Sequence, residues 1–126
     1  MRHRVIVALG TNCGEHSLML AKKQLAEVFE NITFTRAMET EPIGTTFNGI
    51  NFHNALATFS TVKSVASVIA MLKQVEQACG DSRDMRGKGI VVSDIDILKY
   101  DGDRFHQGDW EREYIRTLMS ETETNS

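Results

Sequence analysis

The chain has 126 residues, which fits one domain around a single hydrophobic core. Its 41% hydrophobic and 25% charged residues exclude a chain that is disordered throughout. A net charge of −3 and a pI near 5.8 exclude an overall basic surface for nucleic acid. The apolar run at residues 5–9 is too short for a signal sequence or a membrane span. We therefore expect a cytoplasmic protein, a monomer or weak dimer, with no nucleic-acid or membrane partner and with Cys13 and Cys79 as free thiols.

The first half of the chain predicts two strands on either side of a helix. Residues 5–9 are apolar on both faces, as in a central strand, and a turn cluster at residues 10–14 ends them. Residues 32–35 are rich in β-formers and predict the second strand. Residues 39–51 hold the only proline and predict a long loop, which in a compact domain is usually functional. Between the two strands, a helix is predicted by apolar residues that recur at helical spacing, namely Leu18, Ala21, Leu25, Val28 and Phe29.

The second half begins with a predicted strand over residues 52–61. Ser64 is placed to cap the helix that follows, and Gly80 is placed to end it. Residues 81–89 are charged and glycine-rich without periodicity, which predicts a loop. The apolar face of the predicted helix consists of Val65, Val68, Ile69, Leu72, Val75 and Cys79.

The C-terminal part predicts a hairpin and a short helix. A fourth strand covers residues 91–100, and Asp101-Gly102 is a strong hairpin signal into a short strand at residues 104–106. Residues 121–126 are polar and predict a disordered tail, so a single domain spans residues 1–120. Helical spacing before the tail connects Trp110, Tyr114, Ile115 and Leu118.

This order, β-α-β-β-α-β followed by a hairpin and a short helix, predicts an α+β fold. It is the ferredoxin-like order, in which two helices pack on one face of an antiparallel sheet.

The pair Asp94 and Asp96 is the sharpest chemical signal. Residues two apart on a strand project from the same face, while Ile95 and Ile97 between and beyond them point into the core. Two carboxylates on one face repel each other unless cations neutralise them, as Mg²⁺ does together with substrate phosphates. The alternative is a solvated strand face whose aspartates pair with nearby lysines, and the pair alone does not decide between them.

The segment that leads into this strand carries Arg83, Arg86 and Lys88 among glycines. Such cations can organise a polyphosphate and neutralise its charge, although a solvated surface loop has the same composition.

Other polar and aromatic positions offer weaker signals. The pattern Gly10-x-Asn12-x-Gly14 lacks a dinucleotide fingerprint, so Gly10 indicates only close approach of a ligand to the backbone. Asn54 in the middle of a strand needs hydrogen-bond partners and can bind the edge of a heterocycle. Phe52 and Tyr114 can stack on such a ring, but aromatic residues more often belong to the core.

Taken together, these segments resemble the 6-hydroxymethyl-7,8-dihydropterin pyrophosphokinases. The resemblance lies in an ordered set of blocks across most of residues 5–114, namely Val7-Ala8-Leu9-Gly10-Thr11-Asn12-x-Gly14, Glu39-Thr40-Glu41-Pro42-Ile43-Gly44, Asn51-Phe52-His53-Asn54-Ala55, Val75-Glu76-x-x-x-Gly80-x-x-Arg83 and Ser93-Asp94-Ile95-Asp96-Ile97-Leu98.

The resemblance implies transfer of pyrophosphate from ATP to the hydroxymethyl group of the dihydropterin, giving AMP, in folate biosynthesis. Asp94 and Asp96 would bind two Mg²⁺ ions, and with Arg83 and Arg112 they would form the catalytic set. The implied pterin site consists of Gly10, Thr40, Pro42, Ile43, Phe52, Asn54 and Tyr114. The implied nucleotide site consists of Lys73, Glu76, Arg83, Arg86, Lys88, His106 and Arg112.

The sequence departs from the family pattern on the nucleotide side. Asp81 stands where an arginine is usual, and residues 87–91 replace an Arg-Trp-Gly-Pro-Arg segment. Two alternatives follow: a weak or inactive relative that binds a pterin or another small ligand as a regulatory module, or an interaction domain in which the aspartate pair is incidental.

Overall fold

Strand β1 (His3–Thr11) is the centre of the sheet, as its two apolar faces predict. It pairs antiparallel with β4 (Phe52–Thr61) on one side and with β5 (Asp94–Tyr100) on the other. The structure is a computed structural model and describes residues 1–41 and 50–124. In these residues the sheet order is β2-β4-β1-β5-β6, with β2 (Thr33–Phe34) and β6 (Asp103–Arg104) at the edges. The α+β class with an antiparallel sheet is confirmed.

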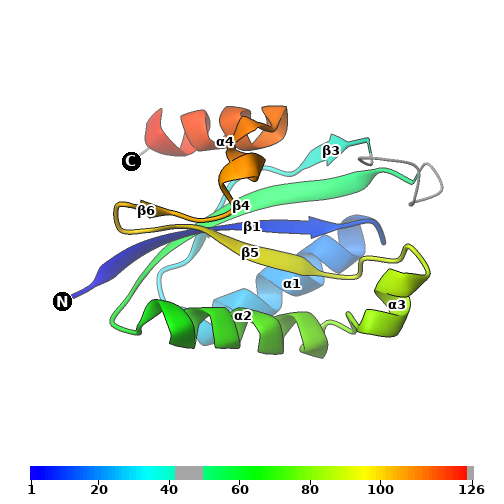
Figure 1. Cartoon of the computed structure of the whole chain (residues 1–126), viewed down its shortest axis with the longest axis horizontal. Helices are drawn as coiled ribbons and strands as arrows, with labels where there is room; N and C mark the ends of the chain where they lie inside the picture. The colour runs from blue at the N-terminus through cyan, green and yellow to red at the C-terminus, as the bar shows by residue number, and fades with distance from the viewer. Residues whose placement is uncertain (42–49, 125–126) are drawn as a thin grey trace.

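Helices α1 (Glu15–Val28) and α2 (Val65–Ala78) lie side by side on one face of the sheet (Figure 1). Ser64 caps α2 as predicted, because its side chain accepts a hydrogen bond of 3.2 Å from the Ser67 amide. Gly80 follows the end of α2 with a φ of +97°, a conformation that glycine adopts without strain.

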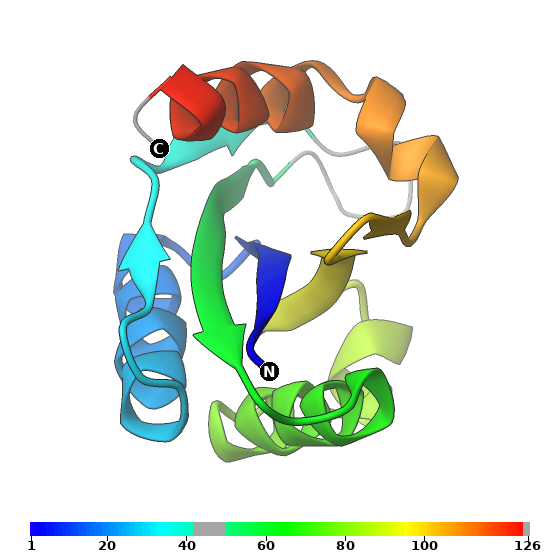
Figure 2. The same cartoon turned by 90° about the vertical axis from the view of Figure 1, so that its left-hand side faces the viewer.

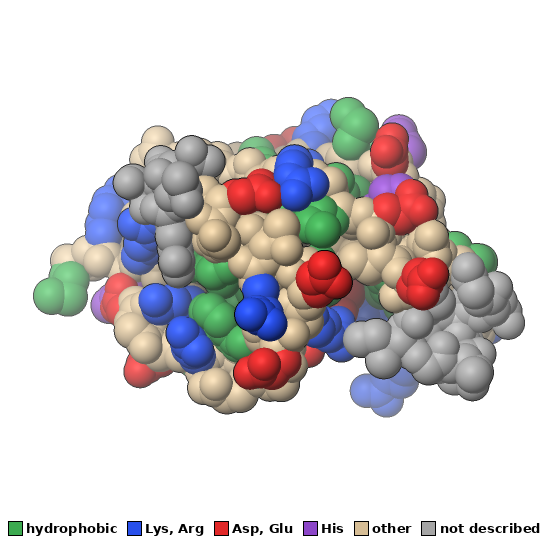
Figure 3. All heavy atoms as spheres, turned by 90° about the horizontal axis from the view of Figure 1, so that it is seen from above, with side chains coloured by type: hydrophobic (Ala, Val, Ile, Leu, Met, Phe, Trp, Pro, Cys, Tyr) green, Lys and Arg blue, Asp and Glu red, His purple; other side chains and the backbone are tan. Residues whose placement is uncertain are grey.

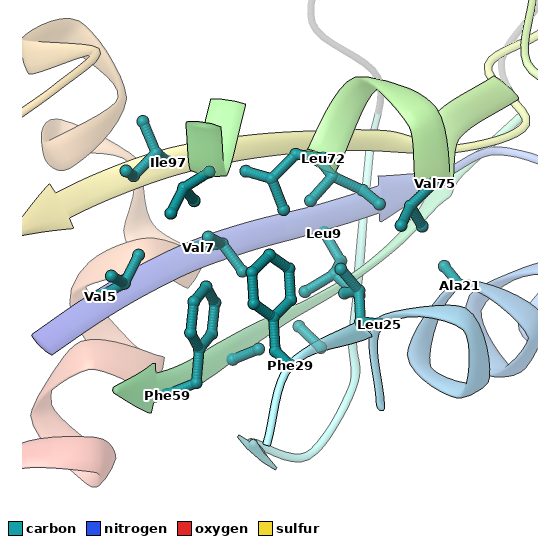
Figure 4. Close-up of a cluster of buried hydrophobic side chains, with 14 of the residues drawn as sticks. Val5, Val7, Leu9, Ala21, Leu25, Phe29, Phe59, Leu72, Val75 and Ile97 are labelled. Atoms are coloured by element: carbon teal, nitrogen blue, oxygen red, sulfur yellow. The ribbon is translucent and has the colours of Figure 1, made fainter. Parts of the chain in front are cut away.

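The main core lies between these helices and the sheet. Val5, Val7 and Leu9 project from β1 toward α1 and α2 (Figure 4). The rings of Phe29, after α1, and Phe59, on β4, stack with their centroids 4.1 Å apart. Because successive side chains of a strand point to opposite faces, one side of β1 lies in this core.

A second apolar cluster lies on the opposite face, beneath α4 (Glu113–Thr124). Figure 2 shows the sheet between α4 on one side and α1 with α2 on the other. The expectation that the helices occupy a single face is therefore incomplete, because α4 buries the other side of the central strands. The cluster consists of Ile6, Leu56, Leu98, Ile115, Leu118 and Met119.

Two segments predicted as loops contain regular structure. Strand β3 (Met38–Thr40) lies at the start of the predicted long loop and pairs with the first residues of β4. Helix α3 (Arg83–Gly87) lies in the charged segment, with Ser82 as its N-cap. Both elements are too short for a period of hydrophobic residues to reveal them.

Other boundaries shift at the C-terminal end. Strand β5 begins at Asp94, three residues later than predicted, and β6 begins one residue before the predicted range of 104–106 and ends two residues before its end. Trp110 belongs to the 3₁₀ helix η1 (Gln107–Glu111) instead of the helix that follows. Helix α4 reaches Thr124, so it includes four residues of the segment predicted as a tail, and residues 125–126 lie outside the described range. None of the helices in the described residues is long and apolar enough to cross a membrane.

The stacked phenylalanines give a test of the main core. Phe59→Ala should lower the free energy of unfolding by about 3–5 kcal/mol, because the side chain is 2% exposed and its loss leaves a cavity. Val62, the residue after the end of β4, is 68% exposed. Val62→Ala is therefore the control and should change the free energy of unfolding by less than about 0.5 kcal/mol. Urea unfolding monitored by circular dichroism measures both. Equal effects of the two substitutions would contradict the assignment of this core.

Candidate active site

Strand β5 presents its two aspartates to the face of the sheet that carries α4. Ile95 and Ile97 are 4% and 3% exposed in the main core, which turns Asp94 and Asp96 to the other side. Asp94 lies opposite Gly10 of β1, and Asp96 lies opposite Ala8. The predicted orientation of the four side chains of this strand is confirmed.

A first cleft of about 530 Å³ opens above these aspartates. Along β1, the residues facing α4 become smaller toward this cleft, from Ile6 through Ala8 to Gly10, and the last two line it. The missing side-chain volume leaves the space that the cleft occupies. Five of the residues predicted for a pterin site line the cleft together: Gly10, Thr40, Phe52, Asn54 and Tyr114. Pro42 and Ile43, the other two, lie outside the described residues.

Asn54 is 4% exposed, and its amide is held in one orientation. Its NH₂ group donates to the Thr40 hydroxyl at 2.7 Å and to the Met38 carbonyl at 3.3 Å. A carbonyl only accepts, so the contact to Met38 decides which atom of the amide is nitrogen. The carbonyl oxygen of Asn54 therefore remains as an acceptor, and it lies 3.2 Å from the place where a Cβ on Gly10 would stand.

A second cleft of about 650 Å³ lies on the other side of β5, bordered by α2 and α3. Most residues predicted for the nucleotide site line this second cleft: Lys73, Glu76, Arg83, Arg86 and His106. Arg112 lines the first cleft instead, where its Nε lies 3.5 Å from an Asp109 carboxylate oxygen. Lys88, the C-cap of α3, lines neither cleft in the described part of the protein.

Asp94, Asp96 and Arg86 line both clefts, so they mark the junction between them. One Nη of Arg86 lies 3.3 Å from the Asp94 carboxylate and 3.9 Å from that of Glu76. His106 approaches Asp96, with 3.9 Å between Nε2 and a carboxylate oxygen. Acidic, basic and apolar side chains are interspersed on the face that carries α4 (Figure 3).

Burial and mutual repulsion change the protonation of these acids. Burial, and then the neighbouring Asp94 carboxylate, raise the pKa of Asp96 to about 6. Burial also raises the pKa of Glu76 to about 7, although this side chain accepts a 2.6 Å hydrogen bond from the Ile95 amide. Burial at the junction therefore disfavours the charged forms of Asp96 and Glu76, and a bound cation would favour them.

The donor set at the junction fits a Mg²⁺ ion that also binds phosphate. Asp94 and Asp96 supply hard oxygen ligands on one face, and their mutual repulsion favours a divalent cation. In the residues that the structure describes, no group of three or more His, Cys, Asp or Glu side chains is arranged to hold a metal ion. The remaining ligands would then come from phosphate oxygens and water, which is how Mg²⁺ is commonly bound.

Several residues at these clefts were not predicted from the sequence. Glu41, Asp109 and Glu113 line the first cleft, and Ser82 and Asp81 line the second. The position of Asp109 three residues before Arg112 was the available signal for one of them. The others depend on which loops meet across the sheet, which local patterns do not reveal.

The family model of 7,8-dihydro-6-hydroxymethylpterin-pyrophosphokinase (HPPK) matches residues 6–124. The chain belongs to the HPPK family. Membership supports a pterin pyrophosphokinase activity in folate biosynthesis, and the HPPK family generally uses ATP and Mg²⁺. No curated protein matches the chain.

Among solved structures, the chain is similar to the YXEP protein of Bacillus subtilis, described as a dinuclear metal binding peptidase from the M20 family. The identity is 18% and the TM-score 0.39, over 80% of this chain and 26% of that protein. The chain thus spans about a quarter of the other protein's length, and a likeness this weak defines neither fold nor function.

Glu76 makes the stability of this HPPK-family protein depend on pH. Its pKa is about 7 when folded against a usual 4.5, so it stabilises the fold below pH 4.5 and this contribution is lost as pH rises through 7. Glu76→Gln retains an oxygen for the Ile95 amide. In metal-free buffer the variant should match the wild type near pH 4.5 and exceed its free energy of unfolding increasingly up to pH 7, as measured by urea unfolding. A constant difference across this range would contradict the raised pKa.

Asp101 provides a control of opposite sign. Hydrogen bonds from His3 and from the Arg4 amide lower the pKa of Asp101 below its usual 3.8. Its contribution is therefore present above pH 3.8 and lost as pH falls below it. Asp101→Asn should be less stable than the wild type at pH 7, with a difference that shrinks under acid, in the same unfolding experiment.

Proposed function

We propose that the protein transfers the β,γ-pyrophosphoryl group of ATP to the hydroxymethyl oxygen of 6-hydroxymethyl-7,8-dihydropterin. A bond forms between that oxygen and the β-phosphorus, the bond from the β-phosphorus to the oxygen bridging it to the α-phosphorus breaks, and AMP leaves. The hydroxyl proton is released to a base or to water. Such a transfer depends on alignment and charge neutralisation more than on covalent help from the protein.

The observation that carries this proposal is the junction between the two clefts. A two-substrate transfer needs both reactants in line at one point, and Asp94, Asp96 and Arg86 border both clefts at such a point. Two Mg²⁺ ions bound by the aspartates would neutralise the phosphate charge during transfer.

The first cleft suits a flat, polar heterocycle. Phe52 and Tyr114 would hold the two sides of the ring, and burial raises the pKa of the Tyr114 phenol. The carbonyl oxygen of Asn54 would accept a hydrogen bond from an N–H group on the edge of the pterin, because both of its donors already have partners. Thr40 would fix the amide, and Pro42 and Ile43 would complete the wall as the resemblance implies.

The second cleft suits the triphosphate of ATP. Lys73, Arg83 and His106 line it and would neutralise phosphate oxygens, and Glu76 lines it as well. Arg112 would approach the transferred group from the first cleft. The sheet order β2-β4-β1-β5 with α1 and α2 on one face supports a fold of the ferredoxin-like kind. We expect the protein to act as a monomer or weak dimer.

The direct test is an assay for AMP. The purified protein, incubated with ATP, Mg²⁺ and 6-hydroxymethyl-7,8-dihydropterin, should release AMP, detected by chromatography, and chelation of Mg²⁺ should stop the reaction. Asp94→Asn and Asp96→Asn should each lower kcat by at least about 10²-fold, because each removes charge at the transfer point. The exposed Asp103→Asn, on β6, is the matched control and should keep wild-type activity.

The outcomes of this assay separate the candidate functions. Tight pterin binding by calorimetry without AMP would refute the enzyme and leave a pterin-binding module. Neither turnover nor pterin binding would leave an interaction domain.

Gly10 offers a test of the first cleft alone. Gly10→Ala places a methyl group 3.2 Å from the Asn54 carbonyl oxygen, which displaces the acceptor proposed for the pterin. We expect dihydropterin affinity, measured by calorimetry, to fall by about tenfold, the equivalent of ~1.4 kcal/mol. The control is Gly102→Ala, in a turn with no atom within 4 Å of the added methyl. Unchanged affinity in Gly10→Ala would place the pterin elsewhere.

A further inference from the structure

We propose that Asp81 is a positioning residue, whose carboxylate fixes the Arg86 guanidinium at the junction of the two clefts. The inference rests on the proposed function, since it concerns the cation that meets the phosphates during transfer. It is carried by the contacts of Asp81, which lies between α2 and α3 and whose negative carboxylate would repel a phosphate instead of binding it.

Both carboxylate oxygens of Asp81 are engaged. Oδ2 accepts a hydrogen bond of 2.9 Å from Nε of Arg86. Oδ1 accepts from the backbone amides of Val92 and Ser93, at 3.0 and 3.2 Å. The Asp81 side chain is only 8% exposed. Its negative charge is therefore largely buried, and its hydrogen bonds go to Arg86 and to the two backbone amides that precede β5.

This anchor decides where the guanidinium lies. With Nε held by Asp81, one Nη donates to the Ser93 carbonyl at 3.2 Å and to Asp94 at 3.3 Å. Arg86 thereby reaches the aspartate that borders both clefts, while 38% of its side chain stays exposed for a ligand. A long arginine side chain on the five-residue helix α3 would otherwise sample many rotamers, and fixing it in advance removes that entropy cost from phosphate binding.

The other acids near Arg86 are weaker anchors. Glu76 lies 3.9 Å from the nearest Nη and already accepts the Ile95 amide. Asp94 lies 3.3 Å away and is 40% exposed. The Asp81 contact is the shortest of the three and the most buried, and it is bonded to the Nε edge, which leaves the Nη edge directed at the junction.

The substitution Asp81→Asn separates the two roles of this carboxylate. An asparagine keeps an oxygen for the Val92 and Ser93 amides but turns an NH₂ group toward Nε, so the strand contact persists and the arginine is released. Arg86→Ala removes the cation itself. Asp84→Asn, exposed on α3, is the matched control for loss of a negative charge and should leave all parameters unchanged.

Two measurements follow for each variant: kcat and KM in the AMP assay, and calorimetric binding of Mg²⁺ with α,β-methylene-ATP. We expect Arg86→Ala to lower kcat by about 10²-fold and Asp81→Asn by about tenfold, with KM for the dihydropterin unchanged. The double variant should equal Arg86→Ala, because Asp81 acts through Arg86. Binding of the analogue should weaken about tenfold in Asp81→Asn and show the same lack of additivity.

An Asp81→Asn loss of equal size with and without Arg86 would overturn the proposal and assign Asp81 a purely structural role. Unchanged kcat and analogue binding in Asp81→Asn would overturn it as well. If the wild type releases no AMP but binds the analogue, the proposed function fails while the binding measurements still decide the role of Asp81. Absence of analogue binding by the wild type would overturn both.

A measurement on the wild type covers the case in which Asp81→Asn does not fold. The Nε–H signal of Arg86 in nitrogen-15 NMR, assigned by its loss in Arg86→Ala, should exchange with water at least about tenfold more slowly than that of the exposed Arg116. Equal exchange rates would overturn the anchor.

Discussion

The alternation of side chains along β5 connects the hydrophobic core to the candidate active site. Ile95 and Ile97 each contribute about 1.5–3 kcal/mol when buried beneath α2, so a shift of one residue in register would lose both contributions. The same shift would bury Asp94 and Asp96. The energy that holds the core together therefore also keeps two mutually repelling carboxylates on the opposite face, where solvent, a cation or a ligand can reach them.

The outer edge of β5 shows how side chains can substitute for a neighbouring strand. β6 covers only Lys99 and Tyr100, and the amides of Val92, Ser93 and Ile95 bond instead to the carboxylates of Glu76, in the last turn of α2, and of Asp81, three residues after the helix ends. These acids satisfy buried donors, and they gather negative charge beside the aspartate pair. Burial is the main cause of the raised pKa of Glu76, Asp94 adds to it, and the Ile95 amide and Arg86 offset part of it.

The two faces of the sheet have different tasks. On the side of α1 and α2, large side chains from β1 and β4 pack against the helices, and Phe59 and Leu9 are 2% and 1% exposed. On the side of α4, the decrease from Ile6 to Gly10 along β1 leaves a cleft where the helix no longer covers the sheet. A rigid strand thus supplies both a packed end and an open end.

The sequence by itself determined the elements whose signals are local. A short run of apolar residues placed β1, strand-forming residues placed β4, and helical spacing with Ser64 placed α2. The spacing of Asp94 and Asp96 placed both carboxylates on one face of β5. Only the tertiary structure decided that α4 covers the opposite face, that Asn54 turns its oxygen into the cleft, and that Asp81 and Glu76 bond to the backbone of β5. Those features depend on which distant segments dock against each other, and a buried polar group finds its partner only after that docking has excluded water.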